Sequence, residues 1–273
     1  MSDRLLTGRG YYFKSEAPNL PSALTVTYLG VDVGGSGIKS ALVDVSDGSL
    51  ITERLRVDTP QPATPNACAD AMVVQLAEFD YDGEIGVGFP AVVRRGRVHT
   101  ANNIDPTWIG MDVVEFFGAA IGRPVTVIND ADAAAVAEAR FGAAAGVEGL
   151  VLTITFGTGI GSGLLVDGRL VPNLELGQIE LEGHIPAESY FSAKARRTED
   201  LDWDEWGARA NRYLNHVNAV FNPDLMVIGG GLTKHWEMYA QYLDEDLPLI
   251  PAVMGNNAGI VGAALAAADT QVH

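Results

Sequence analysis

Two glycine-rich segments have the composition of turns that bind phosphate. The first is Gly34-Gly35-Ser36-Gly37, between Asp32 and Lys39, and the second is Gly157-Thr158-Gly159-Ile160-Gly161. Glycines let the backbone approach a phosphate closely and present its N–H groups to an anion. Asp32 is able to hold Mg²⁺, directly or through water, because Mg²⁺ prefers carboxylate and water oxygens. Two such turns facing one cleft would hold a phosphate chain from both sides, whereas each turn alone is also explained as a structural turn.

A third glycine segment, Gly229-Gly230-Gly231, follows an apolar run and precedes a predicted helix. Helix N-termini attract phosphate groups, so this segment is a further candidate for phosphate or nucleotide binding. The alternative is a tight strand-to-helix turn. The first two segments do not match a Walker motif, because no Gly-Lys-Ser/Thr follows at the needed spacing. The spacing of Gly157, Gly159 and Gly161, followed by a predicted hairpin, also does not fit a Rossmann turn.

Asn129-Asp130 lies where a predicted strand ends and a predicted helix begins. A carboxylate at this junction is placed to accept the proton of a hydroxyl that attacks a phosphoryl group. The same position suits a helix N-cap, for which Asp is a preferred residue. The local sequence does not separate the two interpretations of Asp130.

Loops elsewhere supply amides and carboxylates of the kind that bind sugar hydroxyls. One stretch runs from Asn102-Asn103 to Trp108, and another is Glu175-x-x-Gln178-x-Glu180. Such groups form paired hydrogen bonds with sugars, but polar loop residues are also commonly just solvated. Alone, these stretches therefore do not predict a sugar site.

The composition excludes several classes of protein. The chain has 273 residues, 47% of them hydrophobic, with 18 Lys plus Arg against 35 Asp plus Glu, so its net charge is −17. This hydrophobic content argues against a disordered chain, and every long apolar run is interrupted, which argues against a membrane protein. A single cysteine, Cys68, excludes a disulfide scaffold and a Cys-rich zinc site. The net charge opposes nucleic-acid binding. The polar N-terminus does not resemble a signal peptide, so we expect a cytoplasmic protein.

An internal repeat predicts a duplicated α/β fold. Residues 150–171 copy the plan of residues 29–51, each with an apolar strand, a glycine turn, a second strand and a hairpin. The spacing also matches, since ten residues separate Gly34 from Asp44 and ten separate Gly157 from Asp167. Strands followed by helices favour an α/β architecture. The predicted strands are 26–33, 40–45, 85–89, 125–128 and 225–228, and the predicted helices are 64–80, 111–121, 131–141, 203–220 and 259–269.

Four motifs together resemble those of the ROK sugar kinases, in the same order along the chain. They are Gly30-Val-Asp-Val-Gly-Gly-Ser-Gly-Ile-Lys39, Asn129-Asp-Ala-Asp-Ala133, Thr155-Phe-Gly-Thr-Gly-Ile-Gly161 and Ile228-Gly-Gly-Gly231. Within that family, Pro172-Asn-x-Glu-Leu-Gly177, Trp203-x-Glu-Trp206 and the run from Asn222 to Gly231 are similar to the actinobacterial polyphosphate glucokinases. The resemblance covers residues 28–267.

The resemblance implies an actin-like, hexokinase-type (ribonuclease H-like) fold of two α/β domains with an interdomain cleft. We therefore predict a small N-terminal domain over residues 26–128 and a larger C-terminal domain over 129–258. Helix 259–270 would fold back onto the first domain, and residues 1–25 would form an extension outside the shared pattern. Members of this family are commonly homodimers.

The resemblance also implies phosphoryl transfer from inorganic polyphosphate or ATP, with Mg²⁺, to the 6-hydroxyl of glucose. Asp130 matches the family's catalytic base. Asn103, Asn129 and Glu175 match positions that hold sugar hydroxyls, and Glu188 matches a further sugar carboxylate. The turns at 34–37 and 157–159 match the phosphate motifs.

Three departures from the family pattern bear on specificity. The family usually has Gly-His where this chain has Gly177-Gln178, and the histidine contacts sugar in many members. Gln178 still donates and accepts hydrogen bonds, so we expect it to bind substrate, but it does not titrate near neutral pH. The segment after Gly231 contains fewer cations than that of the polyphosphate-using relatives, which would weaken binding of a long polyanion. The N-terminal extension is the third departure.

Two other functions remain open from the sequence. The first is a ROK kinase that acts on another sugar or uses ATP alone, which Gln178 and the sparse cations favour. The second is a sugar-binding paralogue that does not catalyse. A DNA-binding repressor of this family would need an added helix-turn-helix, for which the first 25 residues are too few.

Overall fold

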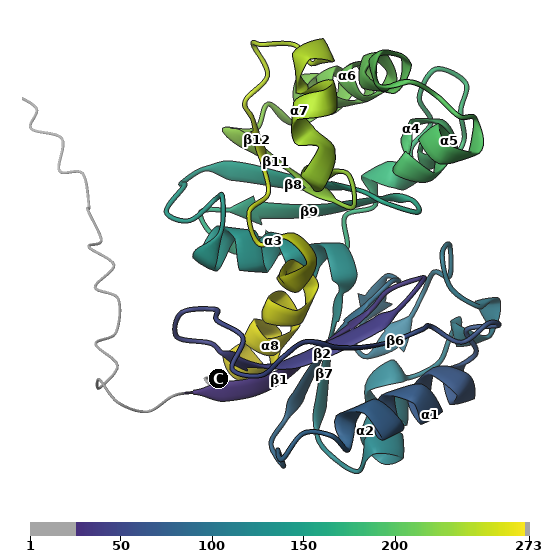
Figure 1. The fold of residues 1–273 in the computed structure, drawn as a ribbon, viewed down its shortest axis with the longest axis vertical. Helices are drawn as coiled ribbons and strands as arrows, with labels where there is room; N and C mark the ends of the chain where they lie inside the picture. Colours follow the sequence, from purple (N-terminus) through teal and green to yellow (C-terminus); the bar gives the residue numbers. More distant parts are fainter. Residues whose placement is uncertain (1–25, 271–273) are drawn as a thin grey trace, which may run out of the picture.

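The structure is a computed structural model that describes residues 26–270, so the N-terminal extension predicted for residues 1–25 lies outside it. It contains two five-stranded sheets, one above the other (Figure 1). The first has the order β3 (Leu55–Val57), β2 (Ile38–Asp44), β1 (Thr27–Val33), β4 (Ile85–Phe89), β7 (Val125–Asn129). The second has the order β10 (Arg169–Val171), β9 (Ile160–Val166), β8 (Leu150–Phe156), β11 (Leu225–Gly230), β12 (Leu249–Pro251).

The two sheets share one plan, as the internal repeat predicts. In each, three strands form an antiparallel meander and two more add in parallel to its first strand. The glycine turns join equivalent strands, β1 to β2 and β8 to β9. Equivalent turns therefore end equivalent strands in the two halves of the molecule.

Helices cover both sheets. They are α1 (Pro65–Leu76), α2 (Val113–Ile121), α3 (Asp130–Phe141), α4 (Glu188–Phe191), α5 (Ala193–Thr198), α6 (Trp203–Phe221), α7 (Trp236–Tyr239) and α8 (Ala258–Thr270). Strands β5 (Val93–Arg94) and β6 (Arg97–Val98) form a separate hairpin, and short 3₁₀ turns lie at Pro106–Trp108, Leu176–Gln178, Thr233–His235, Ala240–Tyr242 and Gly255–Asn257. None of the helices in residues 26–270 has the length and apolar character needed to cross a membrane.

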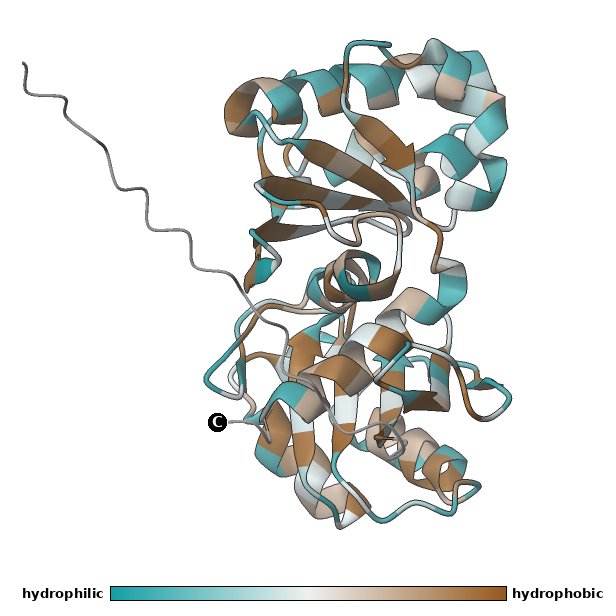
Figure 2. Ribbon diagram, turned by 90° about the vertical axis from the view of Figure 1, so that its left-hand side faces the viewer, coloured by the Kyte–Doolittle hydropathy of each residue, from teal (hydrophilic) through white to brown (hydrophobic). Residues whose placement is uncertain are grey.

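Each sheet has its own hydrophobic core. Trp108, Phe89 and Phe117 pack edge to face or tilted in the core of the first sheet, and Trp206 and Tyr239 pack edge to face in the core of the second. The strands are the most apolar parts of the ribbon (Figure 2). Two smaller apolar clusters around α3 and α8 lie between these cores.

Helix α8 returns the chain from the second sheet to the first. It packs on β1, β4 and β7 of the first sheet and on α3 (Figure 1). The approach is so close that a Cβ atom on Gly86 would lie 1.8 Å from the Ala263 carbonyl oxygen, and one on Gly262 would lie 1.7 Å from that of Ala133. Glycine at these two positions is therefore a condition for this packing. The domain boundary between residues 128 and 129 falls at the junction of β7 and α3, and the division itself stays a prediction.

Candidate active site

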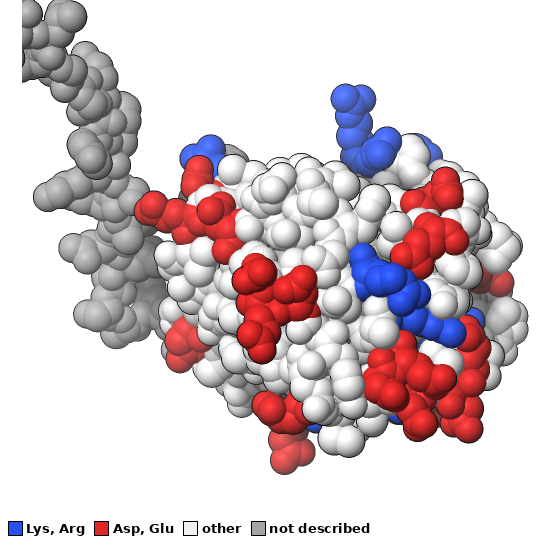
Figure 3. Space-filling view, turned by 90° about the horizontal axis from the view of Figure 1, so that it is seen from above, with Lys and Arg blue, Asp and Glu red and all other residues white. Residues whose placement is uncertain are grey.

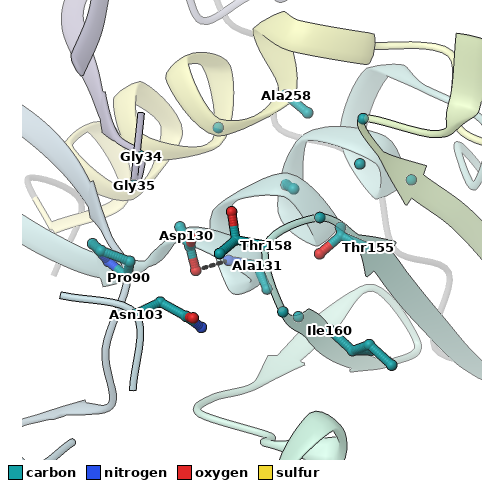
Figure 4. A pocket seen from close by; sticks show the side chains of 18 of the residues that line it. Gly34, Gly35, Pro90, Asn103, Asp130, Ala131, Thr155, Thr158, Ile160 and Ala258 are labelled. Atoms are coloured by element: carbon teal, nitrogen blue, oxygen red, sulfur yellow. Dashed lines mark hydrogen bonds between the residues drawn. The ribbon is translucent and has the colours of Figure 1, made fainter. Parts of the chain in front are cut away.

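A cavity of about 430 Å³ lies between the two sheets and gathers most of the residues singled out from the sequence. Those that line it are Asp32, Gly34, Gly35, Ser36, Lys39, Asn103, Asn129, Asp130, Gly157, Thr158, Gly159, Glu175, Glu188, Gly229, Gly230 and Gly231. Two predicted site residues, Gly37 and Gln178, do not line it. Figure 4 shows Asp130 and Asn103 turned toward the space between the two glycine turns.

Asp130 is the first residue of α3, and Asn129 is the residue that caps the helix. The Asn129 side chain accepts hydrogen bonds from the N–H groups of Ala131 and Asp132, at 2.9 and 3.1 Å. Asp130 Oδ1 accepts one bond, from Ala131 N–H at 2.8 Å. Because Asn129 performs the capping, the Asp130 carboxylate is available at the cavity. The N-cap interpretation of Asp130 is therefore wrong, and its role as a base stays a prediction.

The surroundings of Asp130 disfavour its ionised form. Burial, and after it the nearby carboxylates of Asp32, Glu175 and Asp132, raise the pKa of this carboxyl to about 7, against the Ala131 N–H bond that lowers it. A pKa near neutral suits a general base, which must both accept and release a proton. The geometry and the pKa of Asp130 therefore agree with the role predicted from its motif.

The turn at Gly34–Gly37 is held from outside the cavity by β3 and the residues after it. The Thr59 hydroxyl donates to the Gly34 carbonyl at 2.5 Å, and Arg56 donates to the Ser36 carbonyl at 2.8 Å. Gly34 N–H is bonded to Gly37 O, while the next three N–H groups of the turn have no partner in residues 26–270. With the carbonyls of Gly34, Ser36 and Gly37 occupied, the turn presents free N–H groups, which is the arrangement an anion needs.

Sequence reasoning missed Arg56 and Thr59. The register of the sheet identifies Arg56, because Arg56 on β3 pairs with Lys39 on β2. Its guanidinium also lies where a Cβ atom on Gly37 would be, 2.6 Å from Nε. Gly37 thus serves the turn by admitting Arg56, rather than by facing the cavity.

The second turn is fixed to the helices behind it. Gly157 N–H donates to Gly159 O at 2.9 Å, and Lys194 N–H donates to Gly157 O at 3.0 Å. Ile160 N–H, which follows directly, donates to the Glu188 carboxylate at 2.9 Å. The two glycine turns therefore face the cavity from opposite domains, as a site for a phosphate chain requires.

The regular helix expected after Gly231 is not formed. A 3₁₀ turn at Thr233–His235 and the four-residue α7 take its place. The Thr233 hydroxyl donates to the Gly230 carbonyl at 2.9 Å, and Trp236 and Tyr239 pack into the aromatic cluster around α6. These contacts favour a tight, irregular segment. Gly229–Gly231 lines the cavity, but without the N-terminus of a full helix beside it.

The carboxylates at the other end of the cavity are Glu175 and Glu188. Burial, and after it the carboxylates of Glu188 and Asp132, raise the pKa of Glu175 to about 7. Gln178 donates to Glu188 Oε1 at 2.9 Å. Asn173, two residues before Glu175, bonds the Val93 N–H and C=O of the first domain through its side chain, at 3.0 and 3.1 Å. This pair links the Glu175 loop directly to the first domain.

The donor set beside the first turn fits a phosphate-bound Mg²⁺. Asp32 lines the cavity near Asp130, and its Oδ2 forms a salt bridge of 2.8 Å with Lys39. In residues 26–270 there is no group of three or more His, Cys, Asp or Glu side chains placed to hold a metal by themselves. Mg²⁺ at kinase sites is bound by one or two carboxylates together with substrate phosphates and water, which is what this site offers.

The sequence profile of the ROK family matches residues 28–198 of this chain. The polyphosphate glucokinase of Mycobacterium tuberculosis is 40% identical over 260 residues, which cover 94% of this chain and 98% of that protein. The chain belongs to the ROK family. The resemblance stated from the motifs is confirmed.

Solved ROK structures have the same fold. The inorganic polyphosphate/ATP-glucomannokinase from Arthrobacter gives a TM-score of 0.87 at 47% identity, over 89% of this chain and 99% of that one. A ROK family glucokinase from Streptomyces griseus, solved with glucose and AMPPNP, gives 0.75 at 25% identity, over 89% and 99%. These neighbours confirm the predicted actin-like, hexokinase-type α/β fold.

Proposed function

We propose that this ROK protein is a glucokinase that transfers a phosphoryl group from inorganic polyphosphate or ATP to the 6-hydroxyl of glucose. The observation that carries the proposal is the Asp130 carboxylate at the cavity, left free by the Asn129 cap and lying between two glycine turns. The polyphosphate glucokinase relative and the polyphosphate/ATP-glucomannokinase neighbour support the choice of substrates.

In this mechanism the chain mainly positions its substrates. Asn103, Asn129, Glu175 and Glu188 bind the sugar hydroxyls, and Asp130 accepts the proton of the attacking hydroxyl. The turns at 34–37 and 157–159 hold the donor in line with that hydroxyl, since phosphoryl transfer depends on positioning and on stabilising charge. Mg²⁺ bound with the donor would neutralise phosphate charge, and Asp32 is the residue that would hold it, directly or through water. Closure of the two domains would exclude water.

The surface charge bears on the choice of donor. Figure 3 shows the end of the molecule that carries α6 and α7, where groups of Asp and Glu are interspersed with shorter rows of Lys and Arg. A net charge of −17 repels a long polyanion at a distance, so donor affinity must come from the turns themselves. We therefore expect binding of polyphosphate to weaken less with added salt than in a more basic relative.

The family resemblance also supports four further proposals. The enzyme would work as a homodimer, in the cytoplasm, and would supply glycolysis with phosphorylated glucose. The two domains would divide at residues 128 and 129, with α8 belonging to the first. Nucleic acid and membranes are not among the partners that we propose.

The first test is sugar-6-phosphate formation from glucose and Mg²⁺, with polyphosphate and ATP in separate reactions. Product with polyphosphate would group the enzyme with the relatives that it resembles. Product with ATP alone would indicate that the sparse cations after Gly231 weaken binding of polyphosphate. Mannose belongs in the same panel, because the neighbour with 47% identity is a glucomannokinase. No product from either sugar with either donor would contradict the proposal and favour a sugar-binding paralogue.

The raised pKa of Asp130 predicts a rate that falls in mild acid. A base must be ionised to accept a proton, and burial with neighbouring carboxylates holds the pKa of Asp130 at about 7. Below that pH the protonated fraction grows, so kcat/KM for glucose falls by about tenfold per pH unit for each proton taken up. The measurement is a profile from pH 5.5 to 8.5 at saturating donor. A flat profile over this range would show that Asp130 is ionised throughout and that its surroundings differ from those described.

A further inference from the structure

The Glu188 carboxylate is hydrogen-bonded to two loops. One, residues 175–178, is proposed to bind the sugar and is called the sugar loop; the other follows residues 157–159, which are proposed to bind the phosphoryl donor and are called the donor turn. Its Oε1 accepts a hydrogen bond from the Gln178 amide at 2.9 Å, and its Oε2 accepts one from Ile160 N–H at 2.9 Å. Gln178 ends the 3₁₀ turn Leu176–Gln178, which follows Glu175 at the sugar end of the cavity. Ile160 is the first residue of β9, directly after the donor turn.

Two glycines leave the space that this carboxylate occupies. A Cβ atom on Gly159 would lie 2.1 Å from Glu188 Oε2, and one on Gly177 would lie 3.0 Å from the same atom. Gly159 belongs to the donor turn and Gly177 to the 3₁₀ turn of the sugar end. The carboxylate thus occupies space that a side chain at either position would need, as well as being bonded to both loops.

Gln178 does not line the cavity, although we expected from its hydrogen-bonding groups that it would bind substrate. It is absent from the cavity lining, while its bonded partner Glu188 is part of it. Within residues 26–270 its amide is hydrogen-bonded to Glu188, which places this carboxylate between Gln178 and the cavity.

We propose that Gln178 is a positioning residue that fixes Glu188 between the sugar loop and the donor turn, so that one carboxylate sets the geometry of both substrates. The inference rests on the proposed function. It predicts that loss of the Gln178 amide weakens binding of both the sugar and the donor, through Glu188 alone.

An amide also suits the charge around Glu188. The groups near this carboxylate include Glu175 in the neighbouring loop, the Tyr213 phenol of α6, the N–H of Ile160 and the Asn103 amide, which lies beside Gly159 as the carboxylate does. Glu175 and Glu188 repel one another, and the Tyr213 hydroxyl is buried without a hydrogen-bond partner within residues 26–270. A neutral donor at position 178 stabilises the Glu188 carboxylate without adding a further charge. A carboxylate at 178 would be a third negative group within the same small volume.

The test uses Gln178→Met, which keeps the length but has no N–H donor, and Gln178→Glu, which is nearly isosteric but charged. We expect Gln178→Met to raise KM for glucose and for the donor about tenfold each, with a smaller change in kcat. Gln178→Glu should raise both about 100-fold at pH 8 relative to wild type. At pH 6 the KM values of Gln178→Glu, divided by those of wild type at the same pH, should fall toward the ratios found for Gln178→Met. The reason is that one proton shared by two adjacent carboxylates relieves the repulsion.

A double-mutant cycle with Glu188→Gln separates action through Glu188 from direct contact with sugar. If Gln178 acts only through that carboxylate, Gln178→Met should have little further effect on either KM in the Glu188→Gln background. Gln241→Glu, an exposed position in the 3₁₀ turn Ala240–Tyr242, is the matched control and should behave as wild type. Thermal melting shows whether each variant is folded, and Gln178→Met keeps the test valid if Gln178→Glu is not.

Several results would overturn the inference. One is a change in KM for glucose without a change in KM for the donor. Another is a double-mutant cycle in which the effects of Gln178→Met and Glu188→Gln on KM simply add. The third is a ratio of KM between Gln178→Glu and wild type that does not change with pH. These outcomes are read on a wild-type enzyme that phosphorylates glucose. Absence of product from wild type would instead contradict the proposed function, so the two failures are distinguishable.

Discussion

Asp130→Asn should lose about 10³-fold in kcat while still binding glucose. An amide has nearly the shape of the carboxylate but does not accept a proton at neutral pH, so the attacking hydroxyl would no longer be activated. The N-cap of α3 should survive, because Asn129 and not Asp130 supplies it. The measurement is steady-state turnover with each donor, together with glucose binding by titration calorimetry.

Stability provides a second readout for the same variant. The folded-state pKa of Asp130 is raised above its unfolded value, to about 7, so its ionisation opposes folding as the pH rises through that range. At pH 8 the asparagine variant should therefore melt at or above the wild-type temperature. Asp70→Asn, at an exposed position of α1, is the matched control and should change neither turnover nor melting. Turnover within tenfold of wild type in Asp130→Asn would reject Asp130 as the base.

The local motifs predicted the cavity well because their chemistry is carried by consecutive residues. A glycine turn between two strands, or Asn-Asp at a strand-to-helix junction, has its structure determined largely by its own neighbours. The internal repeat then predicted that the two turns would occupy equivalent places in two sheets. The two sheets have equivalent strand orders, so the two turns do occupy equivalent places.

Contacts between distant segments are what the sequence did not predict. Thr59 and Arg56 hold a turn that lies more than 19 residues earlier in the chain, and Asn173 bonds Val93 across 80 residues. No local pattern marks a polar side chain for such a partner. The position of Gln178 behind Glu188 rather than at the cavity belongs to the same class, since it depends on where α4 places Glu188.

The close packing of α8 was also only partly predictable. Its small residues indicated a helix able to pack closely, but not which glycine meets which carbonyl. In the structure the N-terminal part of α8 approaches Gly30 and Gly86 of the first sheet, while Gly262 faces α3. The helix thus touches the first sheet on one side and, on the other, the helix that begins with Asp130.

Gly262→Ala should destabilise the protein by about 2–3 kcal/mol, at the upper end of the 1–3 kcal/mol that overpacking typically costs, because the contact is with backbone. The added Cβ would lie 1.7 Å from the Ala133 carbonyl oxygen, which is backbone and has no rotamer to change. Alanine is the better helix former by about 1 kcal/mol, so the clash must first exceed that gain. For a chain of this size we expect the melting temperature to fall by roughly 5–10 °C.

The same substitution should reduce kcat, which makes it a test of how the site is held. Ala133 lies one turn beyond Asp130 in α3, so relief of the clash moves the first turn of that helix relative to the glycine turns. Displacement of a catalytic group by about 1 Å can cost about 100-fold in rate, and we expect a loss of about tenfold or more at temperatures where the variant is folded. Gly118→Ala is the matched control, because Gly118 lies within α2 and a Cβ there would come no closer than 3.4 Å to another atom. That variant should be as stable as wild type or more so, with normal turnover. If Gly262→Ala behaved in the same way, α8 and α3 could not approach as closely as the structure shows, and the position of Asp130 would have to be held by the β7 strand and the Asn129 cap alone.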